Sequence, residues 1–310
     1  MEKKENKMEI NTLTNEVRLS AIKKLAEKRN ADLTLDEYEV LSGELQSLLE
    51  YQGPDRIISN AEYWQEKGSE KKDILTFHPQ IWSLDNFTKG FRVGELWSIS
   101  GPTKHGKTTL CETIGRDIQN QGGKVLWFFY EMPEQFMERH REEEGVFYIP
   151  REQRSNDLEW LKRRVFEARM KHGVDAIFID HLHFLVPFRD LMHNASISIG
   201  NTLRILKSEI AVDLGVVVFL VAHTTKSDFS QEPNEGDIRD SSFISQESDG
   251  TIMVFRKLKK EKKWTDDDPF SLKSKLIVCN TRRTGVMNGK INLVKKGNYL
   301  YEEEQQNGID

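Results

Sequence analysis

Cysteine and proline are scarce in this chain of 310 residues. The two cysteines, Cys111 and Cys279, lie far apart in apolar surroundings, so we expect buried thiols in a reducing compartment and no disulfide framework. The 8 prolines do not indicate a long disordered linker. The longest apolar run, residues 216–222, is too short to cross a bilayer, and the charged first residues do not fit a signal peptide. These absences predict a cytoplasmic protein with no membrane segment.

Neither sign of charge dominates the sequence, because the formal net charge is −5. On its own this value argues weakly against nucleic-acid binding, since phosphate contacts need lysine and arginine. The distribution is uneven, however: residues 256–263 are strongly basic and residues 302–304 are acidic. A ring-shaped protein can place a few basic loops at its channel and keep an acidic outer surface, so net charge does not decide the question.

Residues 95–109 carry the strongest pattern in the chain. An apolar stretch, Leu96–Ile99, predicts a buried strand that runs into Gly101–Thr108 and then into a helical pattern. This is the P-loop pattern G-x-x-x-x-G-K-[ST] in the strand–loop–helix setting that it requires. The glycines let consecutive backbone N–H groups point into one hollow, and the helix N-terminus adds partial positive charge. The chain is therefore predicted to bind a nucleoside triphosphate.

Within this loop, Lys107 is expected to reach the β- and γ-phosphates, and the Thr108 hydroxyl is expected to hold Mg²⁺. The residues predicted to contact ATP are Gly101, Pro102, Thr103, Lys104, His105, Gly106, Lys107, Thr108, Thr109, Asp180 and Arg256.

From about residue 74 the sequence alternates strand and helix patterns, which predicts an α/β fold with a mostly parallel central sheet. Helical stripes are predicted within residues 158–168 and 199–214. The last part, residues 290–301, is expected to form a hairpin that turns at Gly297-Asn298. Strands are expected at residues 96–100, 125–130, 176–180, 216–222, 251–256 and 276–280.

The first 70 residues have helical patterns and no strand pattern. One apolar stripe runs from Leu13 to Leu25, and a capping box at Thr34–Glu37 precedes a second apolar face. We predict a small helical N-terminal region at residues 1–70 and a P-loop core at residues 71–310. The N-terminal region either packs on its own core or docks on a neighbouring subunit, and the sequence favours neither.

Three polar residues follow predicted strands: Glu131, Asp180 and His223. Ligands of open α/β sheets gather at the carboxyl ends of the strands. Asp180 is therefore predicted to hold Mg²⁺ together with Thr108, and Glu131 to orient the water that attacks the γ-phosphate. His223 is predicted to sense the γ-phosphate by a hydrogen bond. The two histidines just after Asp180 lack zinc-like spacing, so no metal besides Mg²⁺ is predicted.

Two polar segments are candidates for contact with a threaded polymer. One, residues 184–194, lies just past Asp180, and the other, residues 226–249, is long for a loop in a compact domain. An ordinary solvated loop is the alternative for each. The candidate residues for DNA binding are Arg189, Asn194, Lys226, Arg239, Ser241, Ser242 and Gln246.

An arginine pair, Arg282 and Arg283, follows another predicted strand. A guanidinium group stabilises the charge that develops in phosphoryl transfer, and it cannot be deprotonated. An arginine here is therefore a candidate to complete the site of a neighbouring subunit. The alternative is an arginine on the surface of a hairpin.

Taken together and in order, these motifs resemble the RecA-like motor domain of the DnaB-type (superfamily 4) replicative helicases, which include phage helicase–primases and mitochondrial Twinkle. The resemblance runs from about Ile81 to Tyr301. Residues 237–249 are similar to the family segment D-L-R-x-S-G-x-I-x-Q-x-x-D at equal length. The Asp180-His181 pair and His223 resemble the phage forms.

The resemblance implies an ATP-dependent DNA helicase that forms a ring, expected to be a hexamer, and moves on single-stranded DNA. It implies ATP hydrolysis between subunits with Mg²⁺, and catalytic roles for Lys107, Glu131, His223 and Arg282, with Arg282 acting on the adjoining subunit. The expected partners are single-stranded DNA, further copies of the chain, and a primase or helicase loader. A phage-encoded protein of this kind would work in the cytoplasm of its bacterial host.

Two residues depart from the family pattern. Ser242 replaces the family glycine, and Asn280 stands where the family usually has lysine, two residues before Arg282. Arg283 is a second candidate for the role of Arg282. Two other functions are left open: a RecA-like recombinase or DNA-stimulated ATPase that does not unwind DNA, and a nucleotide-switched loader or adaptor with little turnover, for which the Asn280 departure argues.

Overall fold

The computed structural model describes residues 34, 36, 39, 40, 43, 57–67, 74–130, 133–140, 146–155, 157–186, 195–224, 232–238, 241–258 and 270–303. By its internal contacts the chain divides into two units, residues 1–72 and 73–310. Helix α3 (Asn60–Lys67) belongs to the first unit. The apolar stripes predicted for residues 13–25 and 38–49 lie almost entirely outside the described residues.

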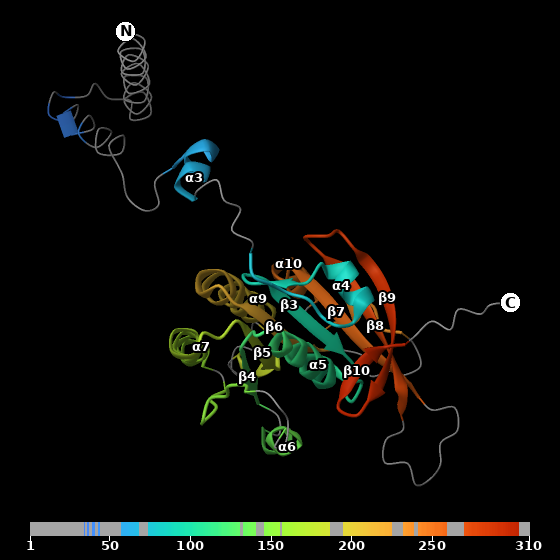
Figure 1. Cartoon of the computed structure of the whole chain (residues 1–310). Coiled ribbons are helices and arrows are strands. Elements are labelled where there is room, and N and C mark those ends of the chain that lie inside the picture. The colour runs from blue at the N-terminus through green and yellow to red at the C-terminus, as the bar shows by residue number, and fades with distance from the viewer. Residues whose placement is uncertain are drawn as a thin grey trace. The chain divides into compact units, whose positions relative to one another are not determined.

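The second unit is built on an eight-stranded sheet with the order β10-β9-β8-β7-β3-β6-β5-β4. The five strands from β7 to β4 are parallel, and β8, β9 and β10 continue the sheet as antiparallel strands. Figure 1 shows β8 and β9 at one side of the sheet and β4 at the other. The predicted α/β fold with a mostly parallel sheet is thus confirmed. The strands of this sheet are β3 (Leu96–Gly101), β4 (Val125–Phe129), β5 (Ala176–Asp180), β6 (Val217–His223), β7 (Gly250–Leu258), β8 (Phe270–Thr281), β9 (Met287–Lys296) and β10 (Tyr299–Glu302).

Helices cover both faces of the parallel strands, which is why those strands appear in the sequence as continuous apolar runs. On one face α5 (Lys107–Asn120) buries Leu110, Ile114 and Ile118 among the aromatic residues of the sheet. On the other face α7 (Leu158–His172), α9 (Ala195–Ile205) and the segment η2 (Leu206–Val212) bury a second apolar cluster. The remaining helices are α4 (Trp82–Thr88), α6 (Pro133–Arg139), α10 (Ser241–Glu247) and the short turns η1 (Leu182–Phe184) and η3 (Glu235–Asp237).

The predicted helix at residues 158–168 is confirmed, with both ends capped. The Asp157 side chain accepts a hydrogen bond from Trp160 N (2.7 Å), and Gly173 closes the helix in the left-handed conformation (φ 69°). The single helix predicted at residues 199–214 is wrong in detail, because the structure has α9 followed by a π-helical segment, η2. An apolar pattern records which residues are buried, but it does not record the extra residue in a wider turn.

Three short elements do not appear in the sequence patterns. Strands β1 (Thr76–Phe77) and β2 (Phe91–Arg92) pair with each other in an antiparallel manner, and α4 lies between them. They are too short to show a period. Within the described residues, no helix is both long enough and apolar enough to span a bilayer.

The parallel strands give the sheet two chemically different ends. At the first, which we call the P-loop edge, β3, β5 and β6 end at Gly101, Asp180 and His223. At the other, which we call the opposite edge, β3 and β7 begin and β8 ends, since Trp97 pairs with Gly250 and Gly250 pairs with Thr281. Polar residues follow strands at both edges of the sheet. The two edges are about 17 Å apart, the length of β3 from Leu96 to Gly101.

Candidate nucleotide-binding site

The loop between β3 and α5 has the backbone that a phosphate cradle needs. Gly101 (φ 147°), Lys104 (φ 67°) and Gly106 (φ 97°) all have positive φ angles, which turn the N–H groups of the loop inward. Gly101 also passes so close to β7 that an added Cβ atom would lie 2.3 Å from the Val254 carbonyl oxygen. The second glycine directly precedes α5, so the loop ends at a helix N-terminus.

Lys107 and Thr108 lie where the P-loop prediction expects them. The Lys107 side chain is mostly buried, and its Nζ donates to the carbonyl oxygens of Gly101 (2.9 Å) and Pro102 (3.1 Å). Thr108 Oγ1 donates to Asp180 Oδ2 (2.8 Å), although the two residues are far apart in sequence. The Lys107 ammonium group and two oxygen atoms that can bind a metal ion, from Thr108 and Asp180, therefore lie together at the P-loop edge.

The P-loop is fixed to β7 through His105. His105 is buried, and its Nδ1 accepts a hydrogen bond from Arg256 N (3.0 Å). Burial, together with the charges of Lys107 and Arg256, lowers the pKa of His105 to about 4. The guanidinium group of Arg256 donates to the carbonyl oxygens of Lys104 (3.3 Å) and Ser271 (2.9 Å). Arg256 therefore lies against the loop and supports it, and its contact with nucleotide stays a prediction.

The sequence did not reveal that His181 belongs to the site. His181 and His223 lie at the ends of the neighbouring strands β5 and β6, with ring centroids 4.2 Å apart. His183 is 5.6 Å from His181. Burial, together with the two other histidines and Lys107, lowers the pKa of His181 to about 3. The signal was present, because adjacent parallel strands bring their last residues together. Among the described residues, no group of three or more histidine, cysteine or acidic side chains could hold a metal ion.

The two candidate arginines lie at the opposite edge, and only one of them is exposed. The backbone N–H of Arg282 donates to the Asp249 carbonyl oxygen (2.8 Å), and its side chain is exposed. Within the described part of the chain, the guanidinium group of Arg282 has no hydrogen bond or ion pair. Arg283, by contrast, pairs with Glu95 (2.8 Å) and donates to the carbonyl oxygens of Lys89 (3.2 Å) and Gly90 (2.6 Å). Arg283 as a second candidate for the role of Arg282 stays a prediction, and its side chain already has these partners within its own subunit.

Two of the DNA-binding candidates are described with their side chains. Ser242 and Gln246 are four residues apart on α10 and both are exposed, so they lie on one face of that helix. Ser241 begins α10. The other DNA-binding candidates, Arg189, Asn194, Lys226 and Arg239, and the catalytic candidate Glu131 lie outside the described residues.

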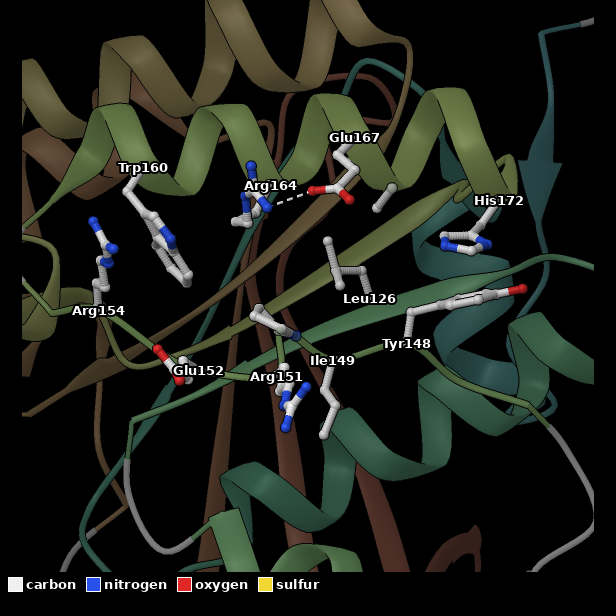
Figure 2. A pocket seen from close by; sticks show the side chains of 12 residues that line it. Leu126, Tyr148, Ile149, Arg151, Glu152, Arg154, Trp160, Arg164, Glu167 and His172 are labelled. Carbon is white, nitrogen blue, oxygen red and sulfur yellow. Dashed lines mark ion pairs between the residues drawn. The ribbon is translucent and has the colours of Figure 1, made fainter.

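A pocket of about 400 Å³ lies elsewhere, between α7 and the segment at residues 148–154. Figure 2 shows Trp160, Arg164, Glu167 and His172 on the helix side, with His172 beside Tyr148 at one end and Trp160 beside Arg154 at the other. None of the predicted site residues lines this pocket. It belongs to the β4 side of the sheet, where Tyr148 forms a bridge with Leu126, and it is distinct from the P-loop edge.

Comparison with known proteins agrees with this geometry. The model of the family described as DnaB-like helicase C terminal domain matches residues 141–301. Among solved structures, the chain is similar to one described as an ATPase domain, with a TM-score of 0.61 and 16% identity, covering 79% of this chain and 97% of that one. It is also similar to a DnaB-like replicative helicase solved with regard to its interactions with primase, with a TM-score of 0.61 and 15% identity, covering 95% of this chain and 77% of that one.

At these identities the two structures show the fold alone, which is that of a RecA-type ATPase domain. The family model, in contrast, spans more than half of the chain and includes Asp180, His223 and Arg282. The chain therefore belongs to the DnaB-like helicase C-terminal domain family, as the ATP-hydrolysing domain of a DnaB-like replicative helicase.

Proposed function

We propose that this chain moves on single-stranded DNA as a ring of identical subunits, a hexamer of phage or phage-like type, and hydrolyses each ATP between two subunits. The position of Arg282 carries this proposal. Asp249, which accepts a hydrogen bond from Arg282 N, pairs through its own N–H with Leu96, the first residue of β3. The P-loop begins at the other end of β3, about 17 Å away. That distance is beyond the reach of an arginine side chain, so Arg282 serves the P-loop of an adjoining subunit.

The residues at the P-loop edge fit Mg²⁺, which proteins hold through one or two carboxylates together with the phosphates of the substrate. Thr108 and Asp180 are two oxygen donors already in contact (2.8 Å). A Mg²⁺ ion held by Thr108 and Asp180 would supply positive charge that offsets the negative charge of the phosphates. Lys107 binds the same phosphates, and His223 senses the γ-phosphate. Glu131 follows β4 by two residues and orients the attacking water.

Single-stranded DNA is the proposed track, held by exposed residues of α10 such as Ser242 and Gln246 together with Arg189, Asn194, Lys226, Arg239 and Ser241. A primase or a helicase loader is the proposed protein partner, and the interactions with primase described for the similar replicative helicase support this choice. The Asp180-His181 pair supports the phage type, and with it the cytoplasm of a bacterial host as the place of action.

Two inactive variants test hydrolysis across the interface. Lys107→Ala removes the phosphate contact but keeps Arg282, and Arg282→Ala keeps the P-loop. Each alone should lose DNA-stimulated ATPase activity by about a thousandfold. In an equal mixture, about a quarter of the interfaces of a cyclic assembly combine an intact P-loop with an intact arginine, so ATPase activity should return to about that fraction of the wild-type rate. If the mixture stays inactive while it assembles normally, Arg282 does not act on its neighbour.

Unwinding of a forked DNA duplex separates the helicase from the two alternatives. A recombinase or DNA-stimulated ATPase would hydrolyse ATP on single-stranded DNA without separating the strands, and an adaptor would show little turnover. The helicase proposal expects strand separation that depends on ATP and disappears in Lys107→Ala.

A further inference from the structure

Glu235 joins the strand that ends near Arg282 to the segment that carries α10. The Glu235 carboxylate accepts hydrogen bonds from Ser245 Oγ of α10 and from Asn280 Nδ2 of β8. Asn280 lies two residues before Arg282. Glu235 is half-buried, and hydrogen bonds to a carboxylate that is partly shielded from water are stronger than exposed ones. This carboxylate therefore links the side chain near the end of β8 to α10.

The same segment is attached to the P-loop edge at its other side. Thr224 directly follows His223 and forms an antiparallel bridge with Ile238, which is buried. Ile238 directly follows η3, the short turn that contains Glu235, and a capping box between Asn234 and Asp237 holds this turn in one conformation. One bridge and one capped turn thus connect the backbone after His223 to Glu235.

A second contact with Arg282 lies where this segment ends. Asp249 accepts the backbone hydrogen bond of Arg282 through its carbonyl oxygen (2.8 Å). Its carboxylate accepts hydrogen bonds from Leu96 N (2.8 Å) and Lys207 Nζ (2.6 Å). The described parts of residues 232–249 therefore contact the residue after His223 through Ile238 and end against the backbone of Arg282 at Asp249.

We propose that Glu235 is a positioning residue that sets the place of Arg282 through Asn280, so that the nucleotide state of one subunit controls hydrolysis in the next. This rests on the proposed action of Arg282 across the interface. It also explains why asparagine stands at position 280, where the family usually has lysine. The neutral amide of Asn280 binds the Glu235 carboxylate without adding a second cation beside Arg282.

Mixing variants tests this proposal. Glu235→Ala should lower the DNA-stimulated kcat by about tenfold to a hundredfold, because a misplaced catalytic group loses that much, while the affinity for ATP changes little. Mixed with Lys107→Ala, which offers a well-placed Arg282, Glu235→Ala should regain activity. Mixed with Arg282→Ala, it should regain none, because both variants fail to present the arginine. A merely destabilised protein would not show this selectivity.

The outcomes separate the two proposals. If Lys107→Ala and Arg282→Ala fail to restore each other, action across the interface is wrong, and the role of Glu235 is wrong with it. If that pair is restored but Glu235→Ala is not restored by Lys107→Ala, only the role of Glu235 is wrong. Wild-type kcat in Glu235→Ala, or restoration by Arg282→Ala, overturns the role of Glu235 as well.

Two further variants control for folding and for general attachment of the segment. Asn280→Asp disrupts the same contact from the β8 side with an isosteric side chain. It should behave as Glu235→Ala in both mixtures, with Lys107→Ala and with Arg282→Ala, even where Glu235→Ala fails to fold. Glu232 lies on the same segment and pairs with Lys275 and Lys290 of β8 and β9. Glu232→Ala removes a carboxylate that is not tied to Asn280, so its DNA-stimulated kcat should stay within about twofold of wild type. An equal loss in Glu232→Ala would overturn the specific role of Glu235.

Discussion

Arg282 and Arg283 are neighbours in sequence but have opposite surroundings. Arg283 is bound by Glu95 and by two carbonyl oxygens, and little of either charged side chain is exposed. Arg282 is exposed. A guanidinium group that is already saturated by its own subunit contributes to stability, whereas an exposed one is available to another molecule.

This contrast predicts opposite effects of two alanine substitutions. Arg283→Ala removes the cation that pairs with the Glu95 carboxylate in a mostly buried place and leaves it the hydrogen bonds from Arg92 N and Trp97 Nε1, so the free energy of unfolding should fall by about 3 kcal/mol. Arg282→Ala should change it by less than about 0.5 kcal/mol while abolishing ATPase activity. Urea unfolding of both variants measures the difference. Equal losses of stability would contradict the assignment of the two roles.

The buried imidazole of His105 predicts a loss of stability in acid. Its pKa is lowered to about 4, so between pH 6.5 and pH 4 the unfolded chain binds a proton that the folded protein does not. Stability therefore falls as the pH falls through this window. The contribution of His105 to the loss between pH 7 and pH 5 is about 2 kcal/mol.

His105→Asn keeps an acceptor for the Arg256 N–H and removes the titration. Urea unfolding at pH 7 and pH 5 should therefore show a loss smaller by about 2 kcal/mol in this variant than in wild type. The same loss in both proteins would show that His105 is not held neutral by the fold.

At the scale of elements, the P-loop depends on its close approach to β7. Gly101→Ala would place a Cβ atom 2.3 Å from the Val254 carbonyl oxygen, whereas at Gly106 the nearest atom is 3.9 Å away. The first substitution must displace the loop or break the pairing of β3 with β7. The second adds backbone strain alone, of about 1–3 kcal/mol.

Both variants should bind a fluorescent ATP analogue more weakly, and Gly101→Ala should also lose more stability than Gly106→Ala. Nucleotide titration and urea unfolding of the two proteins check this order. A less stable Gly106→Ala would mean that backbone strain outweighs the steric overlap with β7.

The sequence predicts elements well where burial imposes a period. The runs that form β3 to β7 are apolar because helices cover both faces of those strands, so each was located to within about two residues. The hairpin of β9 and β10 turns at Gly297 as predicted. Elements that are too short for a period, such as β1 and α4, and the change of helical pitch at η2 leave no such trace.

The site was predictable where motif and topology coincide. Thr108 and Asp180 meet because the P-loop after β3 and the end of β5, a buried parallel strand two places away, share one edge of the sheet. The difference between Arg282 and Arg283, and the contact of Glu235 with Asn280, depend on which side chain finds a partner in three dimensions. No pattern of residue types along the chain distinguishes these cases.

At the scale of the whole molecule, hydrolysis should require association. In the presence of Mg²⁺ and a non-hydrolysable ATP analogue, the mass in solution should correspond to a multiple of the 36.1 kDa chain, expected to be six copies. Analytical ultracentrifugation or mass photometry measures this directly. A particle that stays at the mass of one chain, yet hydrolyses ATP rapidly with DNA, would contradict the proposed site between subunits.

Under the proposed action of Arg282 on an adjoining subunit, its separation from Lys107 along β3 means that every subunit offers one half of a site at each end of its sheet. In an open row of subunits, the P-loop at one end has no Arg282 from a neighbour, and the Arg282 at the other end has no P-loop to act on. Three copies in such a row complete two sites, and the same three in a closed circle complete three. Turnover per subunit should therefore rise at the step that joins the two free ends, without any new contact inside a subunit.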